Sequence, residues 1–235
     1  MITKEEKLVV SGLEVQAVHK DIKNIHVGVY PPYGRVRIAV PLYTTDEKIK
    51  LVIISKYKWI SKQREKFLNQ KRETPREYVT GESHYFMGQR YILDVVTGPY
   101  KGSIGITGKK RMAMYVSSNA GIEDRRKVME MFYRVELAEE LDKLIVKWEK
   151  SLSVQANEVR IRKMKTKWGS ANTKDKRIWI GLELAKKSPK CIEYVVVHEL
   201  AHLIERKHDN KFKSIMDSAL PNWRLLRDEL NDFIY

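Results

Sequence analysis

The chain of 235 residues is poor in cysteine, glycine and proline, with one cysteine, 12 glycines and 7 prolines. A single cysteine cannot form an internal disulfide, so nothing in the sequence indicates an oxidising compartment. The glycine and proline counts exclude collagen-like and low-complexity chains, and an apolar fraction of 43% excludes a disordered one. The length is sufficient for one well-packed domain, or for a large domain with a small one.

Long apolar runs are also missing. The longest aliphatic run, residues 51–54, is far shorter than the ~20 apolar residues that a membrane-spanning helix needs. The opening sequence MITKEEKLVVSG does not have the charged and then apolar layout of a secretory signal. We therefore expect a cytoplasmic protein without a membrane partner.

Basic residues are in excess, with 45 Lys and Arg against 30 Asp and Glu, which gives a net charge of +15. Residues 188–235 hold 7 basic and 8 acidic side chains, so the whole excess lies upstream. It is densest over residues 158–187, with ten basic and three acidic side chains. A basic surface attracts nucleic acids, nucleotides or acidic partners, although dispersed lysines also serve solubility alone. The charge leaves a nucleic-acid or nucleotide partner open.

Strand patterns precede helical patterns along the chain, which indicates an α+β fold. Alternating apolar and polar residues predict a strand and three hairpins, within residues 7–18, 25–40, 84–95 and 103–116. Apolar residues at three-to-four spacing predict two long helices, over about residues 46–70 and 123–150. We expect a strand-rich N-terminal region of residues 1–120, which includes one long helix, and a second region of residues 121–235.

The most informative segment is residues 195–202, with the sequence VVVHELAH. On a helix, His198 and His202 lie one turn apart on the same face, so their imidazoles can bind one cation. Glu199 is offset around the helix and can reach a metal-bound water without being a ligand, which is the position of a general base. The three valines also suit a strand, which would hold the two histidines about 13 Å apart and exclude a shared metal.

The composition around this motif favours the helix. Ser188 and Pro189 are a helix start signal, and the positions that follow are apolar nearly all round the helix. A helix of this kind is buried, so the two histidines are expected to face an interior cleft.

A catalytic metal site needs a third protein ligand and one open position. His208 is the candidate, provided that the chain turns back after the helix, and the polar segment of residues 207–210 favours such a turn. The alternatives are carboxylates on the same helix or on the segments that follow: Glu205, Asp217 and Glu229.

This part of the sequence resembles the YgjP-like metallopeptidase family, which is related to the SprT-like proteases within the zincin group. The resemblance covers about sixty residues and is carried by residues 165–170 (KTKWGS), 178–180 (IWI) and 194–203 (YVVVHELAHL), and by His208 and Phe212. It implies a zincin-like catalytic region built on a buried HExxH helix. It also implies one zinc ion per chain, bound by His198, His202 and His208, with Glu199 as general base.

Two residues depart from the family pattern. Lys167 stands where arginine is expected, and Ala171 where cysteine is frequent. The spacing of the histidines also matches the metzincins, but the turn glycine of that group would fall at Glu205, which disfavours the assignment.

These observations predict a zinc-dependent metallopeptidase in which a metal-activated water attacks the scissile bond and Glu199 is the general base. An extended peptide would pair by strand addition near Trp168, Gly169 and Ser170, which are the expected substrate-binding residues. Two alternatives stay open: a metal-dependent hydrolase of a non-peptide bond, such as a nucleotide phosphoanhydride, and a DNA-associated SprT-like protease. Imidazole accepts several divalent transition metals, so other ions are alternatives to zinc.

Overall fold

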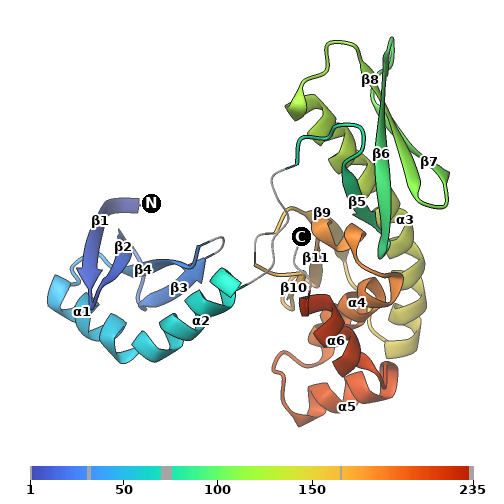
Figure 1. Cartoon of the computed structure of the whole chain (residues 1–235). Helices are drawn as coiled ribbons and strands as arrows, with labels where there is room; N and C mark the ends of the chain where they lie inside the picture. Colours follow the sequence, from blue (N-terminus) through green and yellow to red (C-terminus); the bar gives the residue numbers. More distant parts are fainter. Residues whose placement is uncertain (1, 31–32, 70–75, 165, 233–235) are drawn as a thin grey trace. The chain divides into compact units, whose positions relative to one another are not determined.

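The computed structural model of the protein describes residues 2–30, 33–69, 76–164 and 166–232 (Figure 1). The chain forms two compact units, residues 1–71 and 72–235. This division does not coincide with the change from strands to helices near residue 120, because the hairpins after residue 83 share a core with the helices that follow them.

The first unit contains a four-stranded sheet in the order β1-β2-β4-β3. Its strands are β1 (Ile2–Val10), β2 (Leu13–Lys20), β3 (His26–Tyr30) and β4 (Arg35–Pro41). The central pair β2 and β4 is parallel, and each edge strand is antiparallel to its neighbour. The prediction of one strand over residues 7–18 is wrong. Ser11 and Gly12 have φ of 49° and 75° and form a two-residue turn between β1 and β2.

Two helices, α1 (Asp46–Ser55) and α2 (Tyr57–Asn69), replace the single helix predicted over residues 46–70, of which residue 70 lies outside the described residues. Lys56 ends α1 with φ of −102° and ψ of 5°. The N-cap is Thr45, whose hydroxyl accepts a hydrogen bond from the Lys48 N–H at 3.4 Å. The helices and the sheet share an aliphatic core of Val10, Leu13, Val15, Ala17, Val36, Ile38, Val40, Ile49, Ile53 and Ile60.

The second unit begins with a sheet of the same topology. Its strands, in the order β5-β6-β8-β7, are β5 (Ser83–Phe86), β6 (Gln89–Gly98), β7 (Ser103–Gly108) and β8 (Arg111–Ser117). Again a parallel central pair, β6 and β8, joins two antiparallel hairpins. The long helix α3 (Ile122–Leu152) packs against β7 and β8.

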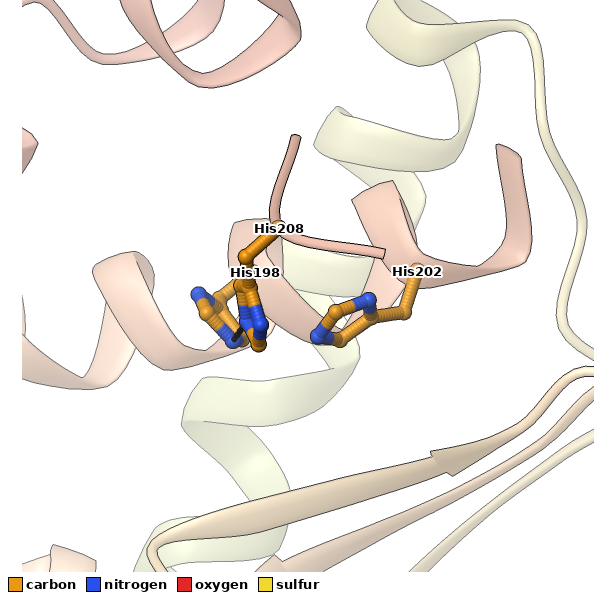
Figure 2. Close-up of side chains that lie close together, drawn as sticks. All are labelled: His198, His202 and His208. Atoms are coloured by element: carbon orange, nitrogen blue, oxygen red, sulfur yellow. Dashed lines mark hydrogen bonds between the residues drawn. The ribbon is translucent and has the colours of Figure 1, made fainter. Parts of the chain in front are cut away.

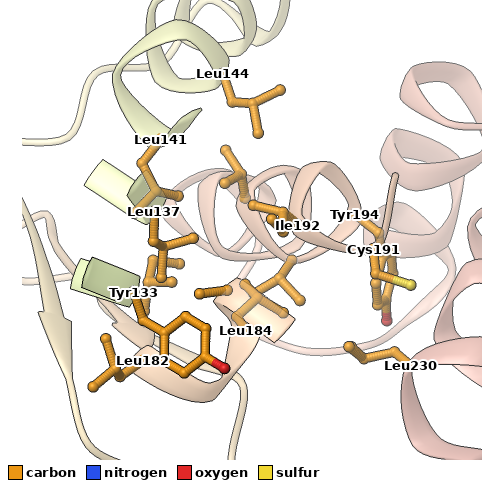
Figure 3. Close-up of a cluster of buried hydrophobic side chains, with 14 of the residues drawn as sticks. Tyr133, Leu137, Leu141, Leu144, Leu182, Leu184, Cys191, Ile192, Tyr194 and Leu230 are labelled. Atoms are coloured by element: carbon orange, nitrogen blue, oxygen red, sulfur yellow. The ribbon is translucent and has the colours of Figure 1, made fainter. Parts of the chain in front are cut away.

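The core of the second unit connects this sheet to the C-terminal helices. Leu93 and Met112 from the sheet, Leu137 from α3 and Val196 from α4 (Pro189–Ile204) belong to one buried cluster. Figure 3 shows side chains of α3, of the 3-10 helix η1 (Leu182–Lys186) and of α4 meeting in this core. The cluster holds α4 within the unit.

A second, three-stranded sheet of this unit packs against α4. It consists of β9 (Glu158–Arg162), β10 (Gly169–Asn172) and β11 (Arg177–Gly181), in the order β10-β11-β9. β11 is parallel to β9 and antiparallel to β10, which is an edge strand. α5 (Asn210–Ala219) and α6 (Trp223–Asp232) complete the unit against α4. None of the helices in the described ranges is long and apolar enough to cross a membrane.

A buried histidine makes the stability of the second unit sensitive to acid. His84 on β5 is 3% exposed, and its Nε2 lies 3.4 Å from a carboxylate oxygen of Glu82. Burial lowers the pKa of His84 from 6.5 to about 4, and the cations Arg76 and Lys186 act in the same direction, against Glu82. The unfolded chain therefore binds a proton near pH 6.5 that the folded chain does not accept until about pH 4.

We predict that the free energy of unfolding falls by about 2–3 kcal/mol between pH 7 and pH 4.5 because of His84 alone. Urea denaturation of the wild type and of His84→Gln at both pH values measures this difference. The exposed His26 gives the control His26→Gln, which is expected to keep the wild-type pH dependence. An unchanged pH dependence in His84→Gln would contradict the assignment.

Candidate metal centre

Helix α4 carries the candidate site, and its start follows from local sequence. The Ser188 hydroxyl caps the helix by accepting a hydrogen bond from the Cys191 N–H at 3.4 Å, and Pro189 occupies the first turn. Nine of its sixteen residues are buried: Cys191, Ile192, Tyr194, Val195, Val196, Val197, Glu199, Leu200 and Ala201. Burial of this apolar surface outweighs the preference of three consecutive valines for a strand.

The chain turns back directly after α4. The helix ends at Ile204, Glu205 is extended with φ of −135° and ψ of 113°, and α5 begins five residues later. The Asp209 side chain caps α5 by accepting a hydrogen bond from the Phe212 N–H at 3.1 Å. This return brings His208 back to the histidines of α4.

His198, His202 and His208 converge (Figure 2). One nitrogen of each ring lies within 4.8 Å of the corresponding nitrogens of the other two, and Nε2 of His198 is 3.2 Å from Nε2 of His208. Among the described residues this is the one group of at least three His, Cys, Asp or Glu side chains close enough to hold a metal ion.

Phe212 packs against all three imidazoles. Its ring centroid lies 5.0 Å from that of His198, 4.7 Å from that of His202 and 4.8 Å from that of His208. The phenyl side chain is 1% exposed, so it is held in the core while it restricts the three rings. The turn and this contact together position His208.

The hydrogen bonds of the rings leave nitrogens available to a cation. Nδ1 of His202 is 3.1 Å from the Glu205 carbonyl oxygen, so Nδ1–H donates there and Nε2 keeps its lone pair. Nδ1 of His198 is buried without a hydrogen-bond partner among the described residues. A buried imidazole nitrogen without a partner is costly. Coordination of an ion through Nε2 of His198 would hold this ring in one orientation.

The protonation state of the histidines suits metal binding. Burial, followed by repulsion from His202 and His208, lowers the pKa of His198 to about 3. Burial also lowers the pKa of His202. These two rings are therefore neutral at pH 7, which is the form that coordinates. Three imidazoles, with no fourth His, Cys, Asp or Glu side chain in their cluster in the described part of the chain, match the donor set of catalytic zinc sites.

Glu199 lies beside the histidines and is only 5% exposed. Burial raises the pKa of its carboxyl to about 7, against the opposing effects of the Lys167 cation and of a hydrogen bond from the Ala171 N–H. Glu199 is thus a weakly acidic group that the protein has desolvated, as expected of a general base.

The histidines and Glu199 open into one cavity of about 690 Å³. The edge strand β10 forms one wall with residues 169–172, and three cations, Lys167, Lys174 and Arg206, also line the cavity. Within the described residues, Glu199 is the one carboxylate among the lining side chains. The cavity therefore combines a histidine cluster, a buried carboxylate, a strand edge and positive charge.

Comparison with protein families shows which family the chain belongs to. The sequence model described as YgjP-like, metallopeptidase domain, matches residues 23–233. The chain belongs to the YgjP-like family. Membership in this metallopeptidase family implies a hydrolase that uses a catalytic metal, typically zinc, and that acts on a peptide or protein.

Two solved structures are similar to parts of this YgjP-like chain. The crystal structure of the metallopeptidase zymogen abylysin of Pyrococcus abyssi is 22% identical, covers 38% of this chain and 90% of its own, and has a TM-score of 0.36. The zymogen jannalysin of Methanocaldococcus jannaschii is 18% identical over 38% of this chain and 91% of its own, with a TM-score of 0.35. None of the curated proteins matches the chain.

The alternative carboxylate ligands are engaged elsewhere. Glu205 accepts a hydrogen bond from the Lys207 N–H at 3.3 Å and lies 3.5 Å from Nζ of Lys211. Asp217 binds the indole N–H of Trp223 at 2.8 Å and pairs with Arg224. Glu229 accepts a hydrogen bond from the Ser188 hydroxyl at 2.9 Å.

Of the three expected substrate-binding residues, Gly169 and Ser170 line the cavity. The Trp168 ring packs against the core instead, with Nζ of Lys187 5.3 Å from its centroid. Lys165, at the start of the same motif, lies outside the described residues. Sequence reasoning did not identify Lys174 and Arg206 as cavity residues, because neither has a spacing signal and only the fold brings them to the cleft.

We predict that His198→Ala, His202→Ala and His208→Ala each lower zinc affinity by at least about 100-fold, since each removes one of three ligands. Competition with a chromophoric chelator measures the affinity. The exposed His26 provides the matched control, and His26→Ala is expected to bind zinc as the wild type does. Wild-type affinity in His208→Ala would show that another side chain completes the site.

Proposed function

We propose that this YgjP-like protein is a zinc-dependent peptidase with a zincin-like catalytic region, within residues 121–235, built on the buried helix α4. The observation that carries the proposal is the buried carboxylate of Glu199 in the same cavity as three converging imidazoles. His198, His202 and His208 would hold the ion. When bound, zinc polarises the scissile carbonyl and makes a water molecule more acidic.

Glu199 moves the proton in this mechanism. Its carboxylate accepts the proton of the attacking water and then delivers it to the nitrogen of the leaving amine. A carboxyl whose pKa burial raises to about 7 is a stronger base than an exposed one, and it remains partly ionised at neutral pH. Both transfers need the same carboxylate close to the reacting atoms.

The strand edge of β10 is the proposed site of peptide binding. β10 pairs with β11 on one side, and its residues Gly169 and Ser170 line the cavity. An extended peptide that adds to this edge would place its backbone across the histidines and next to Glu199. The sheet of residues 83–117, which shares the core of the second unit, would then support the catalytic region rather than supply catalytic groups.

The positive charge of the cavity supports a second candidate function. Lys167, Lys174 and Arg206 favour an anionic substrate, such as a nucleotide whose phosphoanhydride bond is hydrolysed. Peptides and nucleoside triphosphates offered to the same zinc-loaded preparation distinguish the two. Nucleotide hydrolysis without any cleavage of a denatured protein would establish the second function in place of the first.

We predict that Glu199→Gln lowers kcat for peptide cleavage by about 10²–10⁴-fold, which is the usual contribution of a general base, while the variant keeps its zinc. Cleavage of a denatured protein, together with elemental analysis of the variant, measures both effects. The exposed Glu139 on α3 gives the control Glu139→Gln, with wild-type activity expected. Wild-type cleavage by Glu199→Gln would refute Glu199 as the base.

A further inference from the structure

Gly169 is the residue of β10 that lies closest to Glu199. A Cβ atom at position 169 would lie 2.6 Å from Oε1, 2.8 Å from Cγ and 2.9 Å from Cδ of Glu199. These distances are shorter than any normal contact of a Cβ atom. The φ of Gly169 is not positive, so its backbone conformation does not require glycine. Glycine is needed at this position because a side chain here would occupy the space of the Glu199 side chain.

A backbone donor two residues further along β10 holds the same carboxylate. The Ala171 N–H hydrogen-bonds to Glu199. In an antiparallel pair, the backbone groups of alternate residues point toward the partner strand. The Trp168 carbonyl accepts a hydrogen bond from the Gly181 N–H at 2.8 Å, so the alternation directs the Gly169 and Ala171 backbone groups away from β11 and toward the open edge. The donor of Ala171 is thus available to Glu199 without loss of a bond to β11.

β10 has little freedom to move away from Glu199. Gly181 on β11 is packed so closely that a Cβ atom there would lie 3.1 Å from the Trp168 carbonyl oxygen. Lys187, which is 4% exposed, lies over the Trp168 ring. Because the strand is held on this side, the Glu199 side chain is the group that must give way if position 169 gains a side chain.

We infer that Gly169 and Ala171 are positioning residues for the general base: the missing side chain of Gly169 admits the Glu199 carboxylate to its place beside the histidines, and the Ala171 N–H orients it. The inference rests on the proposed function, because it assigns these residues a part in proton transfer. Gly169 also belongs to the proposed peptide-binding edge, but neither residue gives or takes a proton, and the part of both in proton transfer is exerted through Glu199.

The direct test is Gly169→Ala in the full-length, zinc-loaded protein. The added methyl group displaces the carboxylate, and misplacement by about 1 Å costs about 100-fold in rate. We expect kcat to fall by about 100-fold, with KM and zinc affinity close to those of the wild type. In the Glu199→Gln background, Gly169→Ala is expected to cause no further loss of kcat, because it acts through the base.

Gly105 provides a matched control. It lies on the edge strand β7, its φ is not positive, and a Cβ atom there would meet nothing within 4 Å. Gly105→Ala is therefore expected to keep wild-type kcat, zinc affinity and thermal stability. Wild-type kcat in Gly169→Ala would overturn the inference.

A second measurement does not depend on peptidase activity. Glu199→Ala removes Cγ, Cδ and Oε1, which are the atoms that the new methyl group would meet. If Gly169→Ala lowers the thermal midpoint, Gly169→Ala in the Glu199→Ala background should show no such loss. A loss that Glu199→Ala does not relieve would show a structural role for Gly169 and overturn the inference.

A crystal structure of Gly169→Ala separates this inference from the proposed function. If the wild type cleaves no peptide, the proposed function fails, and the position of the carboxylate alone then decides about Gly169. A Glu199 carboxylate displaced from the histidines supports the inference, and a carboxylate in its original place, with the strand shifted instead, contradicts it.

Ala171→Pro tests the other half of the inference. Proline removes the N–H that binds Glu199, and proline is tolerated on an edge strand where its nitrogen does not face the partner strand. We expect a lower kcat with zinc affinity retained. Wild-type kcat in Ala171→Pro would exclude a role for this donor.

Discussion

Helix α4 is surrounded by the core of the second unit along most of its length, and desolvation of its polar residues determines the chemistry of the site. The same burial acts in opposite directions on the two kinds of titratable group. It lowers the pKa of His198 to about 3 and raises the pKa of Glu199 to about 7. Neutral imidazoles coordinate cations, and a carboxylate with a raised pKa accepts protons near neutrality. One structural cause therefore prepares both the ligands and the proposed base.

The burial of α4 also explains how much of the site was predictable. The spacing of His198 and His202 together with an apolar helix surface is a local pattern, so sequence alone predicts the helix, its start and the common face of the two rings. The return of His208 depended on turn-forming residues, which suggested a break without fixing its geometry. The turn alone does not determine the position of the His208 ring. Phe212 restricts this position, since it packs against all three imidazoles.

Features that the spacing of apolar residues does not encode were harder to predict. The turn at Ser11 and Gly12 was missed because apolar residues stand on both sides of it, although the buried positions change from even (Val10) to odd (Leu13 and Val15) across it. The interruption at Lys56 was missed because the apolar spacing does not change there. The short strand β10 has only four residues, with no apolar alternation of its own, and exists through its pairing with β11. Its approach to Glu199 is a tertiary contact, and the one sequence signal for it is the glycine at position 169.

The first unit is a part of the family domain and not an unrelated addition. The family match begins at residue 23 and includes β3, β4 and both helices of this unit. The strand β2, which precedes the match, is nevertheless a central strand and pairs with β4. The unit therefore needs the residues before the match to complete its sheet, even though its described residues contribute none of the three clustered histidines.

The two residues that depart from the expected family pattern, Lys167 and Ala171, both act on Glu199. Lys167 supplies the cation and Ala171 the N–H group that act against burial on the pKa of this carboxyl. Lysine in place of arginine preserves the positive charge. Alanine in place of cysteine preserves a backbone donor that every residue except proline provides. At these two positions a charge and a main-chain group act on Glu199, and the residues expected from the family resemblance would supply the same two features.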